Sequence, residues 1–176
     1  MDLLSRNYFE LFGLSSQFAI DLNLLDLNYR KLQSEVHPDR FVSNSPNERM
    51  QSMQVATQAN EAYRTLKNPT ARARYLLQLQ GIETLEESNT AMPTDFLMMQ
   101  MEWREAAEDA KATRDIPVLD TLLVTMNQEA KTLQGQLQIA LDDNKQLPLA
   151  AEIVRKLSFI DKLRADVEQT IEKLED

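Results

Sequence analysis

The chain has 176 residues, of which 43% are hydrophobic and 27% charged, a composition typical of a soluble globular protein. It contains no Cys and one His, which excludes disulfides, thiolate metal sites, a Cys nucleophile and any site that needs two His side chains. The net charge of −9 argues against nucleic acid as the main partner. No stretch approaches the ~20 apolar residues of a membrane span, and no export signal is evident, so we expect a cytoplasmic protein. The chain contains three Gly and therefore few residues that favour tight turns, and this favours an all-α fold.

Charge is divided unevenly along the chain. Residues 1–80 carry nine Lys or Arg and eight Asp or Glu, whereas residues 81–176 carry ten and twenty. This break near residue 80 indicates two modules with different partners. We therefore expect an N-terminal domain over residues 1–80, a linker over 81–92 and a C-terminal domain over 93–176.

The start of the chain predicts two helices. A short apolar segment ends at Gly13, and Asp21 is a suitable N-cap for the helix that follows. Apolar side chains then recur at alternating spacings of three and four, which is typical of a helix with one apolar face. They are Leu22, Leu25, Tyr29, Leu32 and Val36. Pro38 ends this helix at about Val36, because it disfavours the helical conformation of the residue before it.

A polar loop, residues 37–44, precedes a second long helix. Ser45, Pro46 and Glu48 form a capping-box arrangement with Pro in the first helical position. The apolar face of this helix is predicted to contain Met53, Ala56, Ala59 or Asn60, Tyr63 and Leu66. A short helix over 70–80 closes at Gly81, so we expect two long antiparallel helices with the loop at one end.

Three long helical patterns follow the linker, with Pro93, Pro117 and Pro148 at their starts. The first has the stripe Phe96, Met99, Trp103, Ala106 and Ala110. The second has Leu119, Leu122, Met126, Ala130, Leu133, Leu137 and Ala140. The third has Ile153, Leu157, Ile160, Leu163, Val167, Ile171 and Leu174. Three such stripes with short connections predict a three-helix bundle.

Five segments of the first module stand out by their composition. They are Tyr8-Phe9-Glu10-Leu11-Phe12-Gly13-Leu14, Tyr29-Arg30-Lys31-Leu32, His37-Pro38-Asp39-Arg40-Phe41, Asn60-Glu61-Ala62-Tyr63-Arg64-Thr65-Leu66 and Arg72-Ala73-Arg74-Tyr75-Leu76. In order and spacing they resemble a J domain, and the resemblance covers about the first 80 residues. It implies a co-chaperone that docks on a DnaK-type ATPase and stimulates its ATP hydrolysis.

The same resemblance implies which residues contact the ATPase: His37, Pro38, Asp39, Arg30, Lys31 and Arg40. An exposed Asp39 carboxylate can accept charge-assisted hydrogen bonds from an Arg of the partner, and Pro38 fixes the turn so that docking loses little entropy. The alternative for the three basic residues is an ordinary solvated surface. We identify no Gly-rich phosphate loop in the chain, and we expect no catalytic residue, metal or cofactor.

The helix after Pro93 has more apolar side chains than one face of a bundle needs. The additional side chains and their acidic neighbours, roughly opposite the stripe, are Leu97, Met98, Met101, Glu102 and Glu105. Either they pack against the first module or they form an exposed partner site rimmed by acid. Phe159, which lies off the stripe of the last helix, gives a second and weaker indication of such a site.

Two segments of the second module make the resemblance more specific. They are Pro93-Thr94-Asp95-Phe96-Leu97-Met98-Met99-Gln100-Met101-Glu102-Trp103-Arg104-Glu105 and Val154-Arg155-Lys156-Leu157-Ser158-Phe159-Ile160-Asp161-Lys162-Leu163. They look like the C-terminal domain of the HscB family, J-type co-chaperones of iron–sulfur cluster assembly. This implies binding of the scaffold protein IscU and its presentation to the chaperone HscA. Carried over by position, the scaffold-binding residues are Leu97, Met98, Met101, Glu102, Glu105 and Phe159. Met101 and Trp103 stand where Leu is expected, and a Cys-rich zinc-binding N-terminal extension is absent, as in the bacterial form.

We therefore expect an all-α, L-shaped adaptor whose first module engages the chaperone and whose second holds the client. One alternative is a general J-domain co-chaperone with a different client. Another is a metal-dependent hydrolase that uses adjacent acids, Asp142-Asp143 or Glu86-Glu87. It is disfavoured because neighbouring residues do not share one helix face and no His stands nearby.

Overall fold

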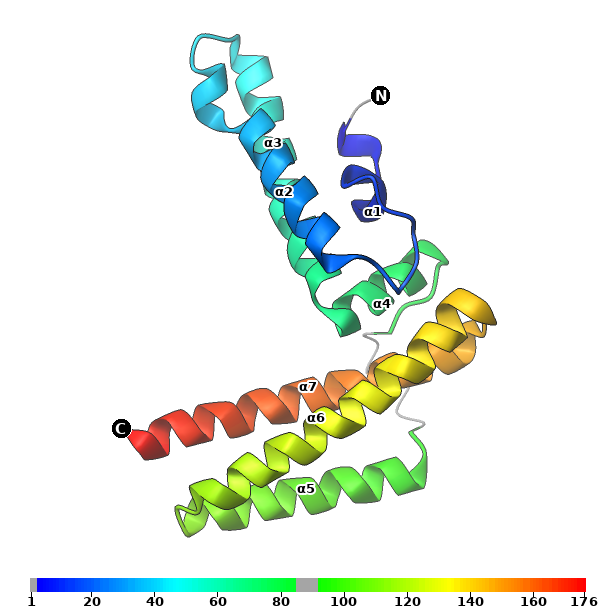
Figure 1. Ribbon diagram of the computed structural model, residues 1–176, viewed down its shortest axis with the longest axis vertical. Coiled ribbons are helices and arrows are strands. Elements are labelled where there is room, and N and C mark those ends of the chain that lie inside the picture. The colour runs from blue at the N-terminus through cyan, green and yellow to red at the C-terminus, as the bar shows by residue number, and fades with distance from the viewer. Residues whose placement is uncertain (1–2, 85–91) are drawn as a thin grey trace. The chain divides into compact units, whose positions relative to one another are not determined.

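The computed structural model describes residues 3–84 and 92–176, and every regular element in these ranges is helical (Figure 1). The chain forms two compact units, Met1–Leu79 and Gln80–Asp176. Unit 1 contains α1 (Tyr8–Leu11), α2 (Leu22–Val36), α3 (Pro46–Lys67) and α4 (Pro69–Leu79). Unit 2 contains α5 (Thr94–Ala112), α6 (Ile116–Gln138) and α7 (Leu147–Glu175). The predicted all-α fold class is confirmed.

The ends of the helices in unit 1 follow from their capping residues. The Asp21 carboxylate accepts hydrogen bonds from the backbone N–H groups of Asn23 (2.9 Å) and Leu24 (3.1 Å), and α2 begins there. Ser45 and Glu48 form a reciprocal capping box at the start of α3. Gly13 has a φ of +64°, a left-handed conformation that side chains disfavour. These ends lie where the sequence predicts them.

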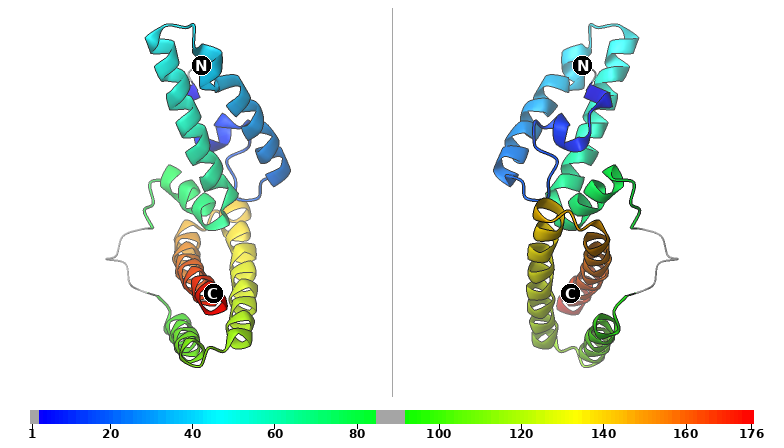
Figure 2. Two further views of the ribbon diagram at one scale, coloured as in Figure 1. Left: turned by 90° about the vertical axis from the view of Figure 1, so that its left-hand side faces the viewer. Right: turned by 90° about the vertical axis from the view of Figure 1, so that its right-hand side faces the viewer.

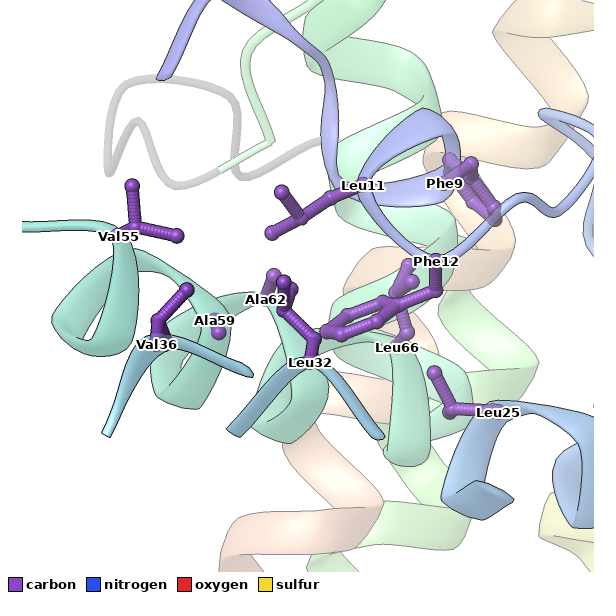
Figure 3. Close-up of a cluster of buried hydrophobic side chains, with 10 residues drawn as sticks. All are labelled: Phe9, Leu11, Phe12, Leu25, Leu32, Val36, Val55, Ala59, Ala62 and Leu66. Carbon is purple, nitrogen blue, oxygen red and sulfur yellow. The ribbon is translucent and has the colours of Figure 1, made fainter. Parts of the chain in front are cut away.

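The core of unit 1 forms where α1 lies against the α2–α3 hairpin (Figure 3). The two long helices run side by side, joined by a loop that contains a short 3₁₀ turn, Pro38–Phe41 (Figures 1 and 2). The buried cluster consists of Phe9, Leu11, Phe12, Leu25, Leu32, Val36, Val55, Ala59, Ala62 and Leu66. Burial of each large apolar side chain contributes about 1.5–3 kcal/mol, so this cluster holds the hairpin together.

Polar contacts connect α4 to the rest of unit 1. The Tyr8 backbone N–H donates to Tyr75 Oη (3.0 Å), and the two rings stack with their centroids 4.3 Å apart. Buried Arg72 donates from Nη1 to the Leu66 carbonyl (2.6 Å), close to the end of α3. The Arg72 guanidinium also lies 4.8 Å from the centroid of the Phe18 ring. These contacts join α1, α3 and α4.

The predicted apolar face of α3 is wrong in its first half. Met53 is exposed, and the buried residues of α3 are Ser52, Val55, Ala59, Ala62 and Leu66. Ser52 can occupy a core position because its hydroxyl donates a 2.6 Å hydrogen bond to the carbonyl of Val36. Leu22, also expected on the apolar stripe of α2, is exposed as well, as is Leu79 at the end of α4.

In unit 2 the three helices pack as the predicted bundle (Figures 1 and 2). Every apolar residue predicted for the second stripe is buried, and its last member, Ala140, lies in a π-helical turn, Ile139–Asp143. The stripe of α7 is buried up to Val167 and half-buried beyond it. On α5 the buried residues are Phe96, Gln100, Trp103 and Ala110. Met99 and Ala106, predicted for this stripe, are half-buried, whereas Gln100, which the apolar spacing does not predict, is buried.

Candidate functional site

The loop between α2 and α3 exposes His37, Pro38 and Asp39 on a short, hydrogen-bonded turn. His37 has an extended backbone (φ −60°, ψ 133°), as expected before a proline. Its carbonyl accepts a 3.0 Å hydrogen bond from the backbone N–H of Arg40, which closes the turn. The His37 and Asp39 side chains are 59% and 87% exposed. Another molecule can therefore reach this turn.

The His37 ring lies against Asp39. Its Nδ1 accepts a 3.3 Å hydrogen bond from the Asp39 backbone N–H and lies 3.5 Å from Oδ2 of the Asp39 carboxylate. These contacts place the ring beside the carboxylate, and the 87% exposure of the Asp39 side chain leaves most of that carboxylate available for a cationic group of a partner.

The basic residues predicted to join this surface are Arg30, Lys31 and Arg40, and all three are exposed. The first two lie on α2 and the third in the 3₁₀ turn. The structure therefore places all of the residues predicted for chaperone binding on the surface of unit 1, along α2 and the loop that follows it.

Asp26 lies one turn before Arg30 on α2, and its carboxylate is bonded to α3. It accepts hydrogen bonds from Lys67 Nζ (2.7 and 2.9 Å) and from Tyr63 Oη (2.9 Å). The hydrogen bond from Lys67, followed by that from Tyr63, lowers the pKa of Asp26 below its ordinary value, and Arg30 has a smaller effect in the same direction. Lys67 is therefore the main partner of this carboxylate, while exposed Glu35 lies one turn after Lys31.

The outer face of α5 carries the predicted combination of apolar and acidic side chains. We call it the α5 patch, and it consists of Leu97, Met98, Met101, Glu102 and Glu105. All of these residues are exposed, and Met101 is 69% exposed. Their spacing places them on one face, opposite buried Phe96 and Trp103. None of the five belongs to the core of unit 2, and flexible Met side chains suit an adaptable contact surface.

Phe159 is 38% exposed on α7. One turn earlier on the same helix, Lys156 Nζ lies 5.7 Å from the centroid of the Phe96 ring at the start of α5. Residues three apart share a helix face, so Phe159 lies on the side of α7 that adjoins α5. Phe96 belongs to the buried face of α5, so this contact places Phe159 towards α5 but does not place it beside the α5 patch.

Among residues 3–84 and 92–176, no group of three or more His, Cys, Asp or Glu side chains could hold a metal ion. Asp142 is half-buried and Asp143 exposed in the π-helical turn, and Glu86 and Glu87 lie outside the described residues. Asp142 and Asp143 therefore do not belong to such a group in the described part of the chain. Within residues 3–84 and 92–176, no helix has both the length and the apolar character that a membrane span needs.

Two exposed apolar residues of α2, Leu24 and Leu27, were not included in the predicted surface. They lie outside the apolar stripe of this helix and on the side that carries Lys31. The sequence contains a signal for them, because α2 has more leucines than its buried face uses.

Comparisons with known proteins agree with this arrangement. The family model described as "HSCB C-terminal oligomerisation domain" matches residues 92–168. The "Co-chaperone protein HscB homolog" of Azoarcus sp. (strain BH72) is 44% identical over 172 residues, covering 98% of this chain and 97% of that protein. The protein of the same name from Burkholderia cenocepacia is 46% identical over 172 residues, with 98% of both chains covered.

Solved structures that are similar to this chain belong to the same family. The chaperone HscB from Vibrio cholerae is 41% identical, with a TM-score of 0.84 over 96% of this chain and 99% of that one. The human co-chaperone protein HscB is 28% identical, with a TM-score of 0.85 over 94% of this chain and 82% of that one. The identity of the relatives, the coverage of both chains and the shared helical fold confirm the resemblance inferred from the sequence. The chain belongs to the HscB family of co-chaperones.

Proposed function

We propose that the chain binds the iron–sulfur scaffold protein IscU, delivers it to the DnaK-type chaperone HscA and stimulates the ATPase of that chaperone. Its action in the cytoplasm would assist the maturation of iron–sulfur proteins. The observation that carries the proposal is the exposed turn His37–Asp39 in a chain related to HscB co-chaperones over almost its whole length. ATP hydrolysis belongs to the partner, and we assign no catalytic residue to this chain.

In this proposal residues 1–80 act as the J domain that engages HscA. The Asp39 carboxylate receives an Arg of the chaperone, and His37 and Pro38 keep that carboxylate in place. Arg30, Lys31 and Arg40 attract an acidic surface of the same partner.

Residues 93–176 hold IscU through the α5 patch and Phe159. Exposed apolar side chains supply the contact area, and Glu102 and Glu105 supply charged edges that fix the orientation of the client. The linker, residues 81–92, joins the two binding surfaces, so one molecule can engage the chaperone and the client together.

The test is the ATPase rate of purified HscA with this protein and IscU, added singly and together. His37→Gln is expected to abolish stimulation while helical content and IscU binding remain, because the side chain is exposed and contributes nothing to the core. Glu102→Lys is expected to weaken IscU binding about tenfold and to leave stimulation without client unchanged.

Glu168→Lys makes the same charge change on an exposed site of α7 and serves as the control. Loss of helical content in His37→Gln would show that the tripeptide is structural. A fall of both activities in either variant would contradict the division of roles. If the unaltered protein does not bind IscU, the client is a different protein, and if Leu97→Ala with Met101→Ala leaves IscU binding intact, the α5 patch is not the binding site.

A further inference from the structure

The exposed side of α2 carries two large apolar residues in addition to its basic ones. Leu27 is 61% exposed and Leu24 is 40% exposed, whereas Leu25 and Leu32 of the same helix are buried. Leu24, Leu27 and Lys31 follow one another at spacings of three and four, so they form a single stripe on the outer face of α2. We call Leu24 and Leu27 the leucine pair.

The charged side chains nearest to Leu27 are basic. Arg30 and Lys31 are exposed within one turn of Leu27. Asp26, the acidic residue between the two leucines, has its carboxylate bonded to Lys67 and Tyr63 of α3. The outer face of α2 therefore combines an apolar contact with a cationic one around Leu27, while the exposed carboxylates of Asp21 and Glu35 lie towards its two ends.

A single exposed leucine is common on protein surfaces and needs no explanation. Here two leucines lie one turn apart on the outer face of a helix in which only Leu25 and Leu32 among the leucines are buried. The core of unit 1 does not use the pair, although each would gain free energy by leaving water. A partner seated over this face would cover both.

We propose that the leucine pair is an apolar contact for the same DnaK-type chaperone that engages the His37–Asp39 turn, an inference that rests on the proposed function. The argument is continuity, because α2 runs directly into that turn and Leu27 precedes His37 by ten residues, about 15 Å along a helix. The matching surface of the chaperone would be an apolar strip beside acidic residues. The basic side chains accelerate encounter, and the leucines slow dissociation.

The experiment measures the concentration of this protein that gives half-maximal stimulation of the HscA ATPase. Leu27→Gln is expected to raise that concentration about tenfold while the maximal rate at saturation is kept. The shift should persist at about 0.5 M salt, because apolar contacts are not screened. Lys31→Ala should also raise the concentration, but its effect should shrink in the same salt because it removes a surface charge.

Leu79→Gln is the matched control, since Leu79 is 43% exposed at the end of α4 and outside this surface. It should leave the half-maximal concentration unchanged. The proposal is overturned if Leu27→Gln behaves like Leu79→Gln, or if the shift disappears in high salt. The variant His37→Gln distinguishes failure of the leucine contact from failure of the proposed function. If His37→Gln still stimulates the HscA ATPase, the proposed function is overturned, and the proposed leucine contact with HscA is overturned as well.

Discussion

Ser52 links the core of unit 1 to the exposed turn. Its hydroxyl, buried in α3, donates a 2.6 Å hydrogen bond to the carbonyl of Val36, the last residue of α2. The carbonyls at the end of a helix lack partners within the helix, and Pro38 removes one backbone donor that could have served them. The Ser52 hydroxyl therefore holds the end of α2, and with it the start of the His37–Asp39 turn, against α3.

We predict that Ser52→Ala lowers the free energy of unfolding by about 1–3 kcal/mol, because it leaves the Val36 carbonyl buried without its donor. Amide hydrogen exchange over residues 37–41 should also accelerate. Urea unfolding and hydrogen exchange measure the two effects. Thr57→Ala is the control, since Thr57 is exposed and its hydroxyl bonds only to the Met53 carbonyl within α3. Equal effects of the two substitutions would show that Ser52 has no special role.

At the scale of elements, polar contacts on one side of the α2–α3 hairpin support its apolar core. The rings of Tyr29 and Tyr63 stack with centroids 4.0 Å apart. Tyr29 Oη donates to Asn60 Oδ1 (2.7 Å), while Tyr63 Oη and Lys67 Nζ donate to the Asp26 carboxylate. These contacts fix how α2 is rotated against α3, and thus which of its residues face outward.

The pairing of Asp26 with Lys67 predicts a pH dependence of stability. The pKa of Asp26 is lowered from its ordinary 3.8, first by the hydrogen bond from Lys67. A carboxyl whose pKa is lower in the folded state adds stability above its ordinary pKa and loses it as the pH falls through the lowered value. Asp26→Asn should therefore reduce stability at pH 7, and the reduction should become smaller as the pH falls below 3.8.

Urea unfolding of both proteins at several pH values tests this prediction. The stability difference between them should be constant from pH 7 to about pH 5 and should then shrink. Asp166→Asn, at an exposed site on α7, is the control and should leave the pH dependence unchanged. A difference that stays constant into strong acid would mean that Asp26 acts through packing alone.

Most helix ends could be predicted from the sequence, but the buried face of α3 could not. Capping depends on a few adjacent residues, and Asp21, Ser45 and Gly13 act locally. The burial of Ser52 depends on a carbonyl of another helix, which no local pattern reveals. Because the polar residue Ser52 occupies a core position, the apolar spacing of α3 is interrupted there, and the neighbouring Met53 was predicted to be buried instead.

The exposure of the candidate sites could be predicted in part. Each candidate on α5 was recognised because it lies opposite the buried face, and all of them are exposed. Leu24 and Leu27 were missed because leucines on a short amphipathic helix suggest a core rather than a surface. Their orientation follows from the contacts of Asp26 and Tyr29 with α3, which only the folded hairpin shows.

At the scale of the whole molecule, each unit has its own buried core. Leu157 and Met126 are fully buried in unit 2, as Leu25 and Leu66 are in unit 1. The two cores share no helix, since the boundary between the units falls after Leu79.

We predict that Leu157→Ala destabilises unit 2 by about 2–5 kcal/mol, because it opens a cavity among buried side chains. Amide protection in the core of unit 1 should remain, and hydrogen exchange read by mass spectrometry measures both units in one experiment. Leu66→Ala is the reciprocal variant and should affect unit 1 alone. An equal loss of protection in both units after either change would show that the chain unfolds as one cooperative body.

Separate cores have an evolutionary consequence. A substitution that reshapes the outer face of α5 leaves the packing beneath the His37–Asp39 turn untouched. Under the proposed function, a few substitutions on the outer face of α5 can therefore change which client is bound while unit 1 keeps its contact with the chaperone.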